Sequence, residues 1–169
     1  MTPTRVISVA LSACFTFGLT LSLAPAASAA ELTVTDPARD NDGQGLDIVS
    51  GMLDNTDYTL TGTVGFRADR DGTLIVGLKA RERAIVRLVS RHRADGGGRN
   101  VLLDRRGRIA CEGLVVNWNG ASATATFGIP STCLWQGNYG AVRPWFLTER
   151  LDSGTDVDFA TTKEFVARG

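Results

Sequence analysis

The chain has 169 residues, of which 43% are hydrophobic and 21% charged, and its 18 basic and 18 acidic side chains give a formal net charge of zero at pH 7. This composition excludes a disordered charged tail, a collagen-like repeat and a disulfide-dense miniprotein. A net charge of zero also gives no general reason to expect nucleic-acid binding.

Residues 1–29 have the three-part pattern of a secretory signal peptide. Arg5 supplies the positive charge, residues 6–23 are apolar, and Ala27-Ser28-Ala29 fits the small-residue cleavage rule. Cleavage there leaves residues 30–169, which is long enough for one secreted β-sandwich domain with its own core.

Two alternatives to a cleaved signal peptide stay open. The apolar run has the length of a retained membrane anchor. Residues 11–14, which end at Cys14, match a bacterial lipoprotein box. After residue 30 no apolar run has membrane length, so we expect no membrane span in the mature chain.

Alternation of apolar and polar residues dominates the rest of the chain and predicts β-strands. Turn residues separate the alternating runs, and Asn119-Gly120 predicts a hairpin. Strands are expected near residues 31–35, 46–53, 58–68, 73–80, 84–93, 99–104, 108–118, 121–129 and 141–150, with a possible last one near 159–167. Eight or nine strands without an amphipathic helix predict an all-β, antiparallel, two-sheet sandwich that is jelly-roll-like.

Residues 36–47 form an acidic, glycine-rich segment between the first two expected strands. Its carboxylates are Asp36, Asp40, Asp42 and Asp47. Oxygen-rich loops with flexible glycines suit calcium, so these four residues are candidate metal ligands. The alternative is a solvated acidic turn without an ion.

A run of basic residues follows the fourth expected strand. It contains Arg81, Arg83, Arg87, Arg91 and Arg93. These odd-numbered arginines would share one face of an unbroken strand. A positive face could bind a glycan or an anionic envelope polymer, with Arg83, Arg87 and Arg91 as candidate ligand contacts. The alternative is a solvated face that discourages edge pairing.

Two cysteines remain after signal cleavage, Cys111 and Cys133. An even pair in an exported protein predicts one disulfide, and two buried free thiols are the alternative. The next segment contains Trp135 and Tyr139 with amide side chains between them, and these two rings are candidates for a sugar-stacking surface or for ordinary packing.

Sparse motifs along the chain resemble a group of exported actinobacterial proteins of unknown function. They comprise Asp36-Pro37 with Asp40, then Leu46-Asp47-Ile48, and the later segments Ile129-Pro130-Ser131-Thr132-Cys133-Leu134 and Asp158-Phe159-Ala160. Residues 36–45 are more distantly similar to the opening loop of DOMON-like and family 9 carbohydrate-binding jelly rolls, some of which bind calcium there. The resemblance implies a β-sandwich with Asp36, Asp40 and Asp42 as calcium ligands, provided that the neighbouring Arg39 points away.

No enzymatic activity is expected. His92 is the one histidine, and the chain has no G-x-S-x-G nucleophile motif. We therefore expect a secreted, non-catalytic binding module, supported by calcium, for a glycan or an anionic envelope polymer. The alternative is a structural or protein-interaction domain of the cell envelope that binds no small ligand.

Overall fold

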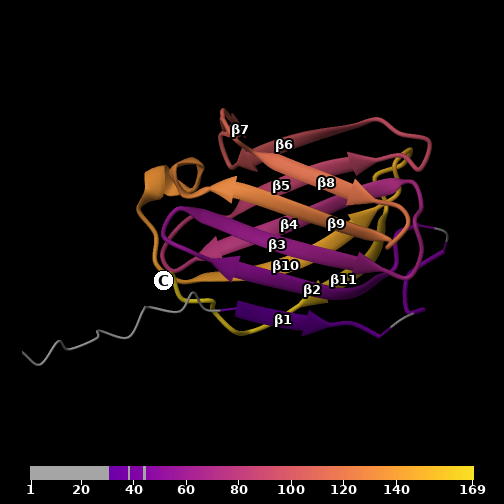
Figure 1. The fold of residues 1–169 in the computed structure, drawn as a ribbon, viewed down its shortest axis with the longest axis horizontal. Coiled ribbons are helices and arrows are strands. Elements are labelled where there is room, and N and C mark those ends of the chain that lie inside the picture. The colour runs from indigo at the N-terminus through magenta and orange to yellow at the C-terminus, as the bar shows by residue number, and fades with distance from the viewer. Residues whose placement is uncertain (1–30, 38, 44) are drawn as a thin grey trace, which may run out of the picture.

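The computed structural model describes residues 31–37, 39–43 and 45–169. The expected signal peptide and both of its alternatives lie outside these residues. The described strands are β1 (Glu31–Thr35), β2 (Ile48–Asn55), β3 (Thr59–Phe66), β4 (Gly72–Ala80), β5 (Val86–His92), β6 (Gly98–Asp104), β7 (Gly107–Ile109), β8 (Val115–Asn119), β9 (Thr124–Pro130), β10 (Val142–Glu149) and β11 (Asp156–Thr161). Two short 3-10 turns, η1 (Ser131–Cys133) and η2 (Trp135–Gly137), follow β9 (Figure 1).

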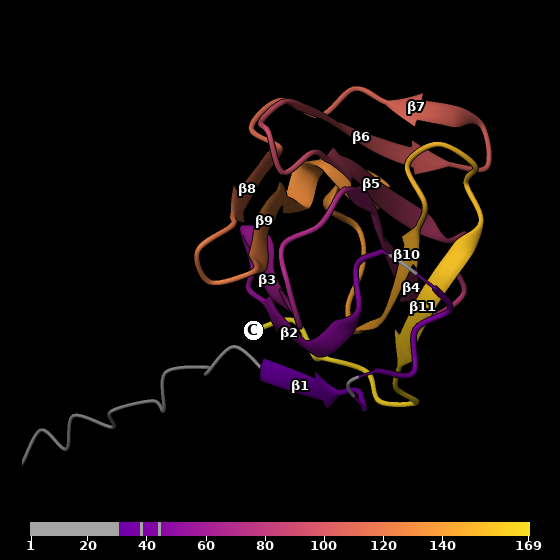
Figure 2. The same cartoon turned by 90° about the vertical axis from the view of Figure 1, so that its right-hand side faces the viewer.

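The strands form two antiparallel sheets. The five-stranded sheet has the order β1-β2-β3-β9-β8, and the six-stranded sheet has the order β11-β10-β4-β5-β6-β7. Figure 2 looks along the strands and shows the two layers facing each other around the interior. The predicted two-sheet antiparallel sandwich is confirmed, although the described residues hold eleven strands where eight or nine were expected.

The prediction of one strand over residues 108–118 is wrong. This segment contains β7 and β8, which belong to different sheets. Between them, Gly113 has a positive φ of 80°. That backbone conformation ends an extended run, and it lets the chain cross from one sheet to the other.

The hairpin predicted at Asn119-Gly120 is present, because β8 pairs with β9. The pairing of Asn119 with Thr124 leaves residues 120–123 as the connection, so the loop has four residues rather than two. Ala123 takes a positive φ of 48° in this loop. The second strand therefore starts at Thr124, three residues later than the alternation predicts.

The core lies between the sheets and is built from the inward side chains of both. Its largest members with essentially no exposed surface include Phe146, Leu46, Ile48, Leu53, Leu60, Leu74, Leu78 and Leu88. Phe146 of β10 packs across the interior against Gly51 of β2, where a Cβ atom would lie 2.3 Å from the ring. A glycine at this position therefore sets how closely the two layers approach.

The predicted Cys111–Cys133 disulfide is confirmed, with an S–S distance of 2.04 Å. It joins the connection between β7 and β8 to η1, and so ties two loops that begin on different sheets. Within the described ranges no helix is both long and apolar enough to cross a membrane.

Candidate functional site: an arginine-lined cavity and an acidic cluster

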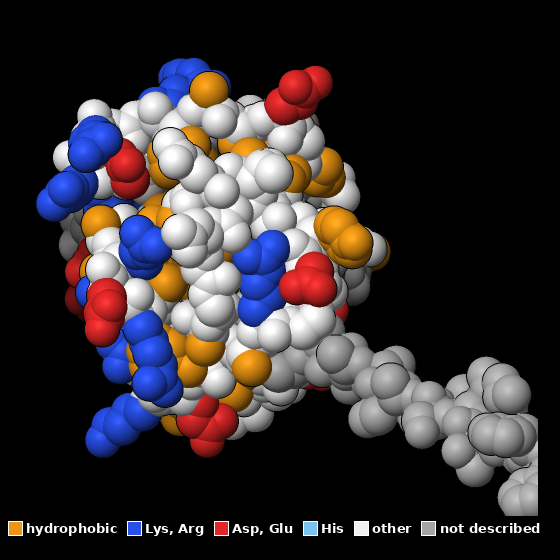
Figure 3. Space-filling view, turned by 90° about the vertical axis from the view of Figure 1, so that its left-hand side faces the viewer, with side chains coloured by type: hydrophobic (Ala, Val, Ile, Leu, Met, Phe, Trp, Pro, Cys, Tyr) orange, Lys and Arg blue, Asp and Glu red, His pale blue; other side chains and the backbone are white. Residues whose placement is uncertain are grey.

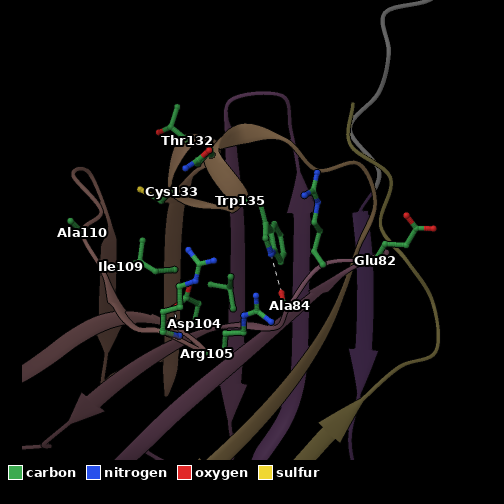
Figure 4. A pocket seen from close by; sticks show the side chains of 13 residues that line it. Glu82, Ala84, Asp104, Arg105, Ile109, Ala110, Thr132, Cys133 and Trp135 are labelled. Atoms are coloured by element: carbon green, nitrogen blue, oxygen red, sulfur yellow. Dashed lines mark hydrogen bonds between the residues drawn. The ribbon is translucent and has the colours of Figure 1, made fainter.

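A cavity of about 690 Å³ lies at the end of the sandwich that carries η1 and η2. Four segments line this end cavity: the β4–β5 turn, the β6–β7 hairpin, the start of the β7–β8 connection, and η1 with η2 (Figure 4). The first three segments belong to or leave the six-stranded sheet, and the last follows a strand of the five-stranded sheet. The cavity is therefore formed where loops from both sheets meet at one end of the sandwich.

Three arginines contribute the positive charge of the end cavity: Arg83, Arg105 and Arg106. Arg83 lies in the β4–β5 turn, while Arg105 and Arg106 form the tip of the β6–β7 hairpin. All three side chains are exposed, and no ion pair of the described residues involves them. Figure 3 shows several basic side chains on this end of the molecule, with acidic ones among them.

The β6–β7 hairpin is fixed by Asp104. Its Oδ1 accepts a hydrogen bond of 2.7 Å from the backbone N–H of Arg106, which is the pattern of an Asx turn. Gly107 then takes a positive φ of 118°. Asp104 thus holds the hairpin and lines the cavity, and its bond to the backbone leaves the two guanidinium groups available.

Trp135 supplies the aromatic wall of the end cavity. Its indole Nε1 donates a hydrogen bond of 2.9 Å to the carbonyl oxygen of Ala84, drawn as a dashed line in Figure 4. The adjacent Cys133 also lines the cavity and carries the disulfide. The ring is therefore held between the β4–β5 turn and the cross-linked loop rather than being free to rotate.

Backbone strain is concentrated around this cavity. Five described non-glycine residues have a positive φ, and three of them line the cavity: Glu82 at 56°, Trp135 at 49° and Gln136 at 58°. Each such residue costs on the order of 1 kcal/mol or more and persists where its surroundings impose it, most often at ligand sites.

Tyr139, the expected partner of Trp135 in a sugar-stacking surface, lies in the core. The two rings are in contact, with centroids 5.3 Å apart and planes at 56°. Tyr139 is only 9% exposed, and the guanidinium of Arg168 covers its ring at 4.7 Å. Burial is the main reason that the pKa of Tyr139 is raised. Of the two aromatic residues, only Trp135 offers a surface to a ligand.

The arginines expected to share one face are separated, because β5 begins at Val86. Arg87 and Arg91 are exposed on the outer face of β5, whereas Arg83 lies before the strand and lines the end cavity. Arg87 and Arg91 lie close enough to Glu149 to oppose the rise in its pKa that burial causes. The structure thus joins Arg83 with Trp135 and leaves Arg87 and Arg91 elsewhere.

An acidic cluster lies at the opposite end of the sandwich. One carboxylate oxygen from each of Asp36, Asp40 and Asp158 lies within 4.8 Å of the other two. Asp36 follows β1 and Asp158 belongs to β11, so the cluster joins the segment after β1 to the last strand. Oxygens bound to one calcium ion at about 2.4 Å can be no more than about 4.8 Å apart, and the cluster meets this limit.

The Asp36 carboxylate is electrostatically unfavourable in its position. Its Oδ2 is buried and has no hydrogen-bond partner among the described residues. Burial, followed by the charges of Asp158 and Asp40, raises the pKa of Asp36 to about 6. Burial also raises the pKa of Asp158, although the backbone N–H groups of Ile48 and Phe159 donate to its oxygens. A bound proton or a bound cation relieves this repulsion.

The other two predicted metal ligands lie outside the cluster. Asp47 is buried, pairs with the Nε of Arg67 at 2.8 Å and accepts the backbone N–H of Arg39. Asp42 is exposed, and its backbone N–H donates to Val157. The side chain of Arg39 is exposed. Among the described residues it forms no ion pair with the acidic cluster.

His92 does not form a catalytic triad with its neighbours. Its Nε2 lies 2.7 Å from Asp69, and its ring stacks on Trp118 at 4.2 Å. The hydroxyl of the nearby Ser90 donates to Asn100 and accepts the indole N–H of Trp118. Ser90 is therefore engaged with groups other than the histidine, so this trio lacks the serine–histidine bond that nucleophile activation requires.

Sequence reasoning does not select three residues of these sites. Asp158 lies 122 positions after Asp36 in the sequence. The only sequence feature that points to Asp158 is its place in the Asp158-Phe159-Ala160 motif. The position of Arg105 and Arg106 at a turn could be predicted from the sequence, since the flanking Asp104 and Gly107 are typical of a hairpin turn.

The comparisons with known proteins add no relative. No family model, no curated protein and no solved structure matches the chain.

Proposed function

We propose that the chain is a secreted, non-catalytic module that binds an acidic glycan of the cell envelope in the end cavity. The observation that carries this proposal is the meeting of three arginines with the Trp135 indole around one cavity of about 690 Å³. Among the described residues these arginines form no ion pair. A guanidinium binds a sugar carboxylate through two parallel hydrogen bonds. The indole offers an apolar face for the ring that carries it.

One further observation supports ligand binding in this cavity. The Trp135 hydrogen bond, the disulfide and the left-handed residues hold the cavity walls before a ligand arrives. Preorganisation of this kind lowers the entropy that binding costs. The disulfide also fits an oxidising compartment outside the cytosol.

Calcium is proposed as a support of the fold at the acidic cluster. Asp36, Asp40 and Asp158 would hold the ion, and the buried, unpartnered Oδ2 of Asp36 fits this role. A bound ion would neutralise the three carboxylates and join the loop after β1 to β11. It lies at the end opposite to the arginines, so it would take no direct part in binding the glycan.

A calorimetric titration with a defined probe tests the binding proposal. The probe is a tetramer of galacturonic acid, and its methyl-esterified form is the uncharged control. We expect the acid to bind and the ester to bind about tenfold more weakly or worse, because charge-assisted hydrogen bonds are lost. The double variant Arg105→Ala/Arg106→Ala should lose affinity for the acid to a similar extent.

Arg99→Ala is the matched control variant. Arg99 is an exposed arginine of β6 that does not line the end cavity, and its removal should leave binding almost unchanged. Equal binding of acid and ester, no binding of the acid, or equal losses in Arg99→Ala and the double variant would each contradict the proposal.

A further inference from the structure

A second cavity lies on the outer face of the six-stranded sheet and differs from the end cavity in chemistry. This groove has a volume of about 560 Å³ and lies over β10, β11 and the loop after β1. Trp145, Leu147 and Phe159 form its apolar surface. None of the arguments for the acidic-glycan site uses this groove, so the two sites stand independently.

The aromatic surface of the groove is flat because of a glycine. Trp145 of β10 pairs with Gly77 of β4, and a Cβ atom at Gly77 would lie 1.8 Å from the indole. The absence of that atom lets the indole lie against the sheet. Phe159 is 53% exposed, with its ring 6.1 Å from that of Trp145 and tilted by 43°. The groove therefore has one flat aromatic wall and one inclined wall.

The charged groups that line the groove are all acidic. They are Asp40, Asp42, Asp156 and Asp158. Asp40 and Asp158 belong to the acidic cluster, where calcium would neutralise them. Asp42 and Asp156 are exposed and lie outside the cluster, so they would not be ligands of the ion.

We infer that this groove binds an amino sugar through its ammonium group. The carboxylates of Asp42 and Asp156 would accept hydrogen bonds from the ammonium, and the two rings would attract it electrostatically while the sugar ring stacks on Trp145. Charge complementarity selects this ligand. An acidic sugar would be repelled by the carboxylates, and a neutral sugar would gain only the stacking.

Titration with a tetramer of glucosamine tests this inference. The control is the tetramer of N-acetylglucosamine, which has the same backbone but no ammonium group. The measurement is made with calcium present and at a mildly acidic pH, where the amines are charged. We expect the glucosamine tetramer to bind at least about tenfold more tightly than the acetylated form.

Asp42→Asn/Asp156→Asn should reduce the affinity for the glucosamine tetramer by about tenfold or more and leave the melting temperature almost unchanged, since both side chains are exposed. Asp152→Asn is the matched control, because Asp152 is an exposed aspartate that does not line the groove. Trp145→Ala should also weaken binding. The end-cavity variant Arg105→Ala/Arg106→Ala should bind the glucosamine tetramer as the parent does. The result of this test can therefore be interpreted even if the acidic-glycan proposal fails.

The inference is overturned if the glucosamine tetramer does not bind or if the acetylated tetramer binds equally well. An equal loss in the Asp152→Asn control would overturn it too, because the attraction would then be a general one between opposite charges. A loss of affinity in Trp145→Ala together with full affinity in the double asparagine variant would also overturn it, because stacking alone would then account for binding.

Discussion

At the scale of single residues, the acidic cluster makes the stability of the fold depend on pH. The raised pKa of Asp36, about 6, means that the native state holds this proton more tightly than the unfolded chain. Asp36 therefore makes its full contribution to the free energy of unfolding only below the ordinary aspartate pKa. This contribution falls as the pH rises from about 4 to about 7.

We predict that calcium reverses this dependence. In a chelator the melting temperature should fall between pH 4 and 7, whereas with millimolar calcium it should be highest near pH 7, where the carboxylates are ionised. A hundredfold excess over Kd contributes about 2.7 kcal/mol. Scanning calorimetry across this pH range measures both effects. The same fall in melting temperature with and without calcium would contradict the calcium proposal.

Asp36→Asn isolates the responsible group. We predict that this variant has a higher melting temperature than the parent in a chelator at pH 7, because a buried charge is removed. It should also lose the response to calcium. Asp42→Asn is the control and should behave like the parent, since Asp42 is exposed and lies outside the cluster. An unchanged calcium response in Asp36→Asn would contradict the assignment.

Gly77 offers a second test at this scale. We predict that Gly77→Ala destabilises the protein by about 1–3 kcal/mol, because the added methyl group must displace the Trp145 indole. Gly128→Ala is the matched control in β9, since nothing lies within 4 Å of its added Cβ. Urea unfolding compares the two, and equal stabilities would show that the indole moves without cost.

At the scale of elements, the disulfide connects the fold to the end cavity. It links the β7–β8 connection to η1 across a sequence separation of 22 residues. We predict that Cys111→Ala/Cys133→Ala costs about 3 kcal/mol of stability on the chain-entropy model. It should also weaken binding of the galacturonic acid tetramer, because Cys133 and Trp135 belong to the same lining segment. A variant that unfolds more easily but binds equally well would show that the bridge does not position the cavity.

The strands that could be predicted from the sequence are those with clean alternation. Residues 59–66 and 142–149 form β3 and β10 close to the expected bounds, because one face of each is buried. Residues 108–118 could not be divided correctly, since alternation does not reveal that Gly113 changes the direction of the chain. The last strand runs over residues 156–161 rather than 159–167, and only a single bridge between Val142 and Val166 extends the pairing.

The candidate sites were predictable only where the chain brings residues together locally. Asp36 and Asp40 are four residues apart, and both join the acidic cluster. The link between Arg83 and Trp135 depends on the way two loops fold over the end of the sandwich, which no local pattern contains. Groups separated by 50 or more positions meet through the sheet topology, and many topologies share the same alternation.

At the scale of the whole molecule, the two cavities differ in the charge of their lining although the net charge of the chain is zero. The register of β10 places Val142 beside Ala80 at the arginine end and Glu149 beside Thr73 at the other end, where Asp156 follows. Three arginines line the end cavity together with Glu82 and Asp104, whereas the charged residues that line the groove are all acidic.

The three tryptophans provide the most direct measurement. Trp135 lines the end cavity, Trp145 lies in the groove, and Trp118 is stacked between His92 and Phe66. In an NMR titration with the galacturonic acid tetramer, we predict that the indole N–H resonance of Trp135 shifts while those of Trp118 and Trp145 stay in place. A titration that leaves Trp135 unmoved, or that shifts Trp145 instead, would contradict an acidic-glycan site in the end cavity.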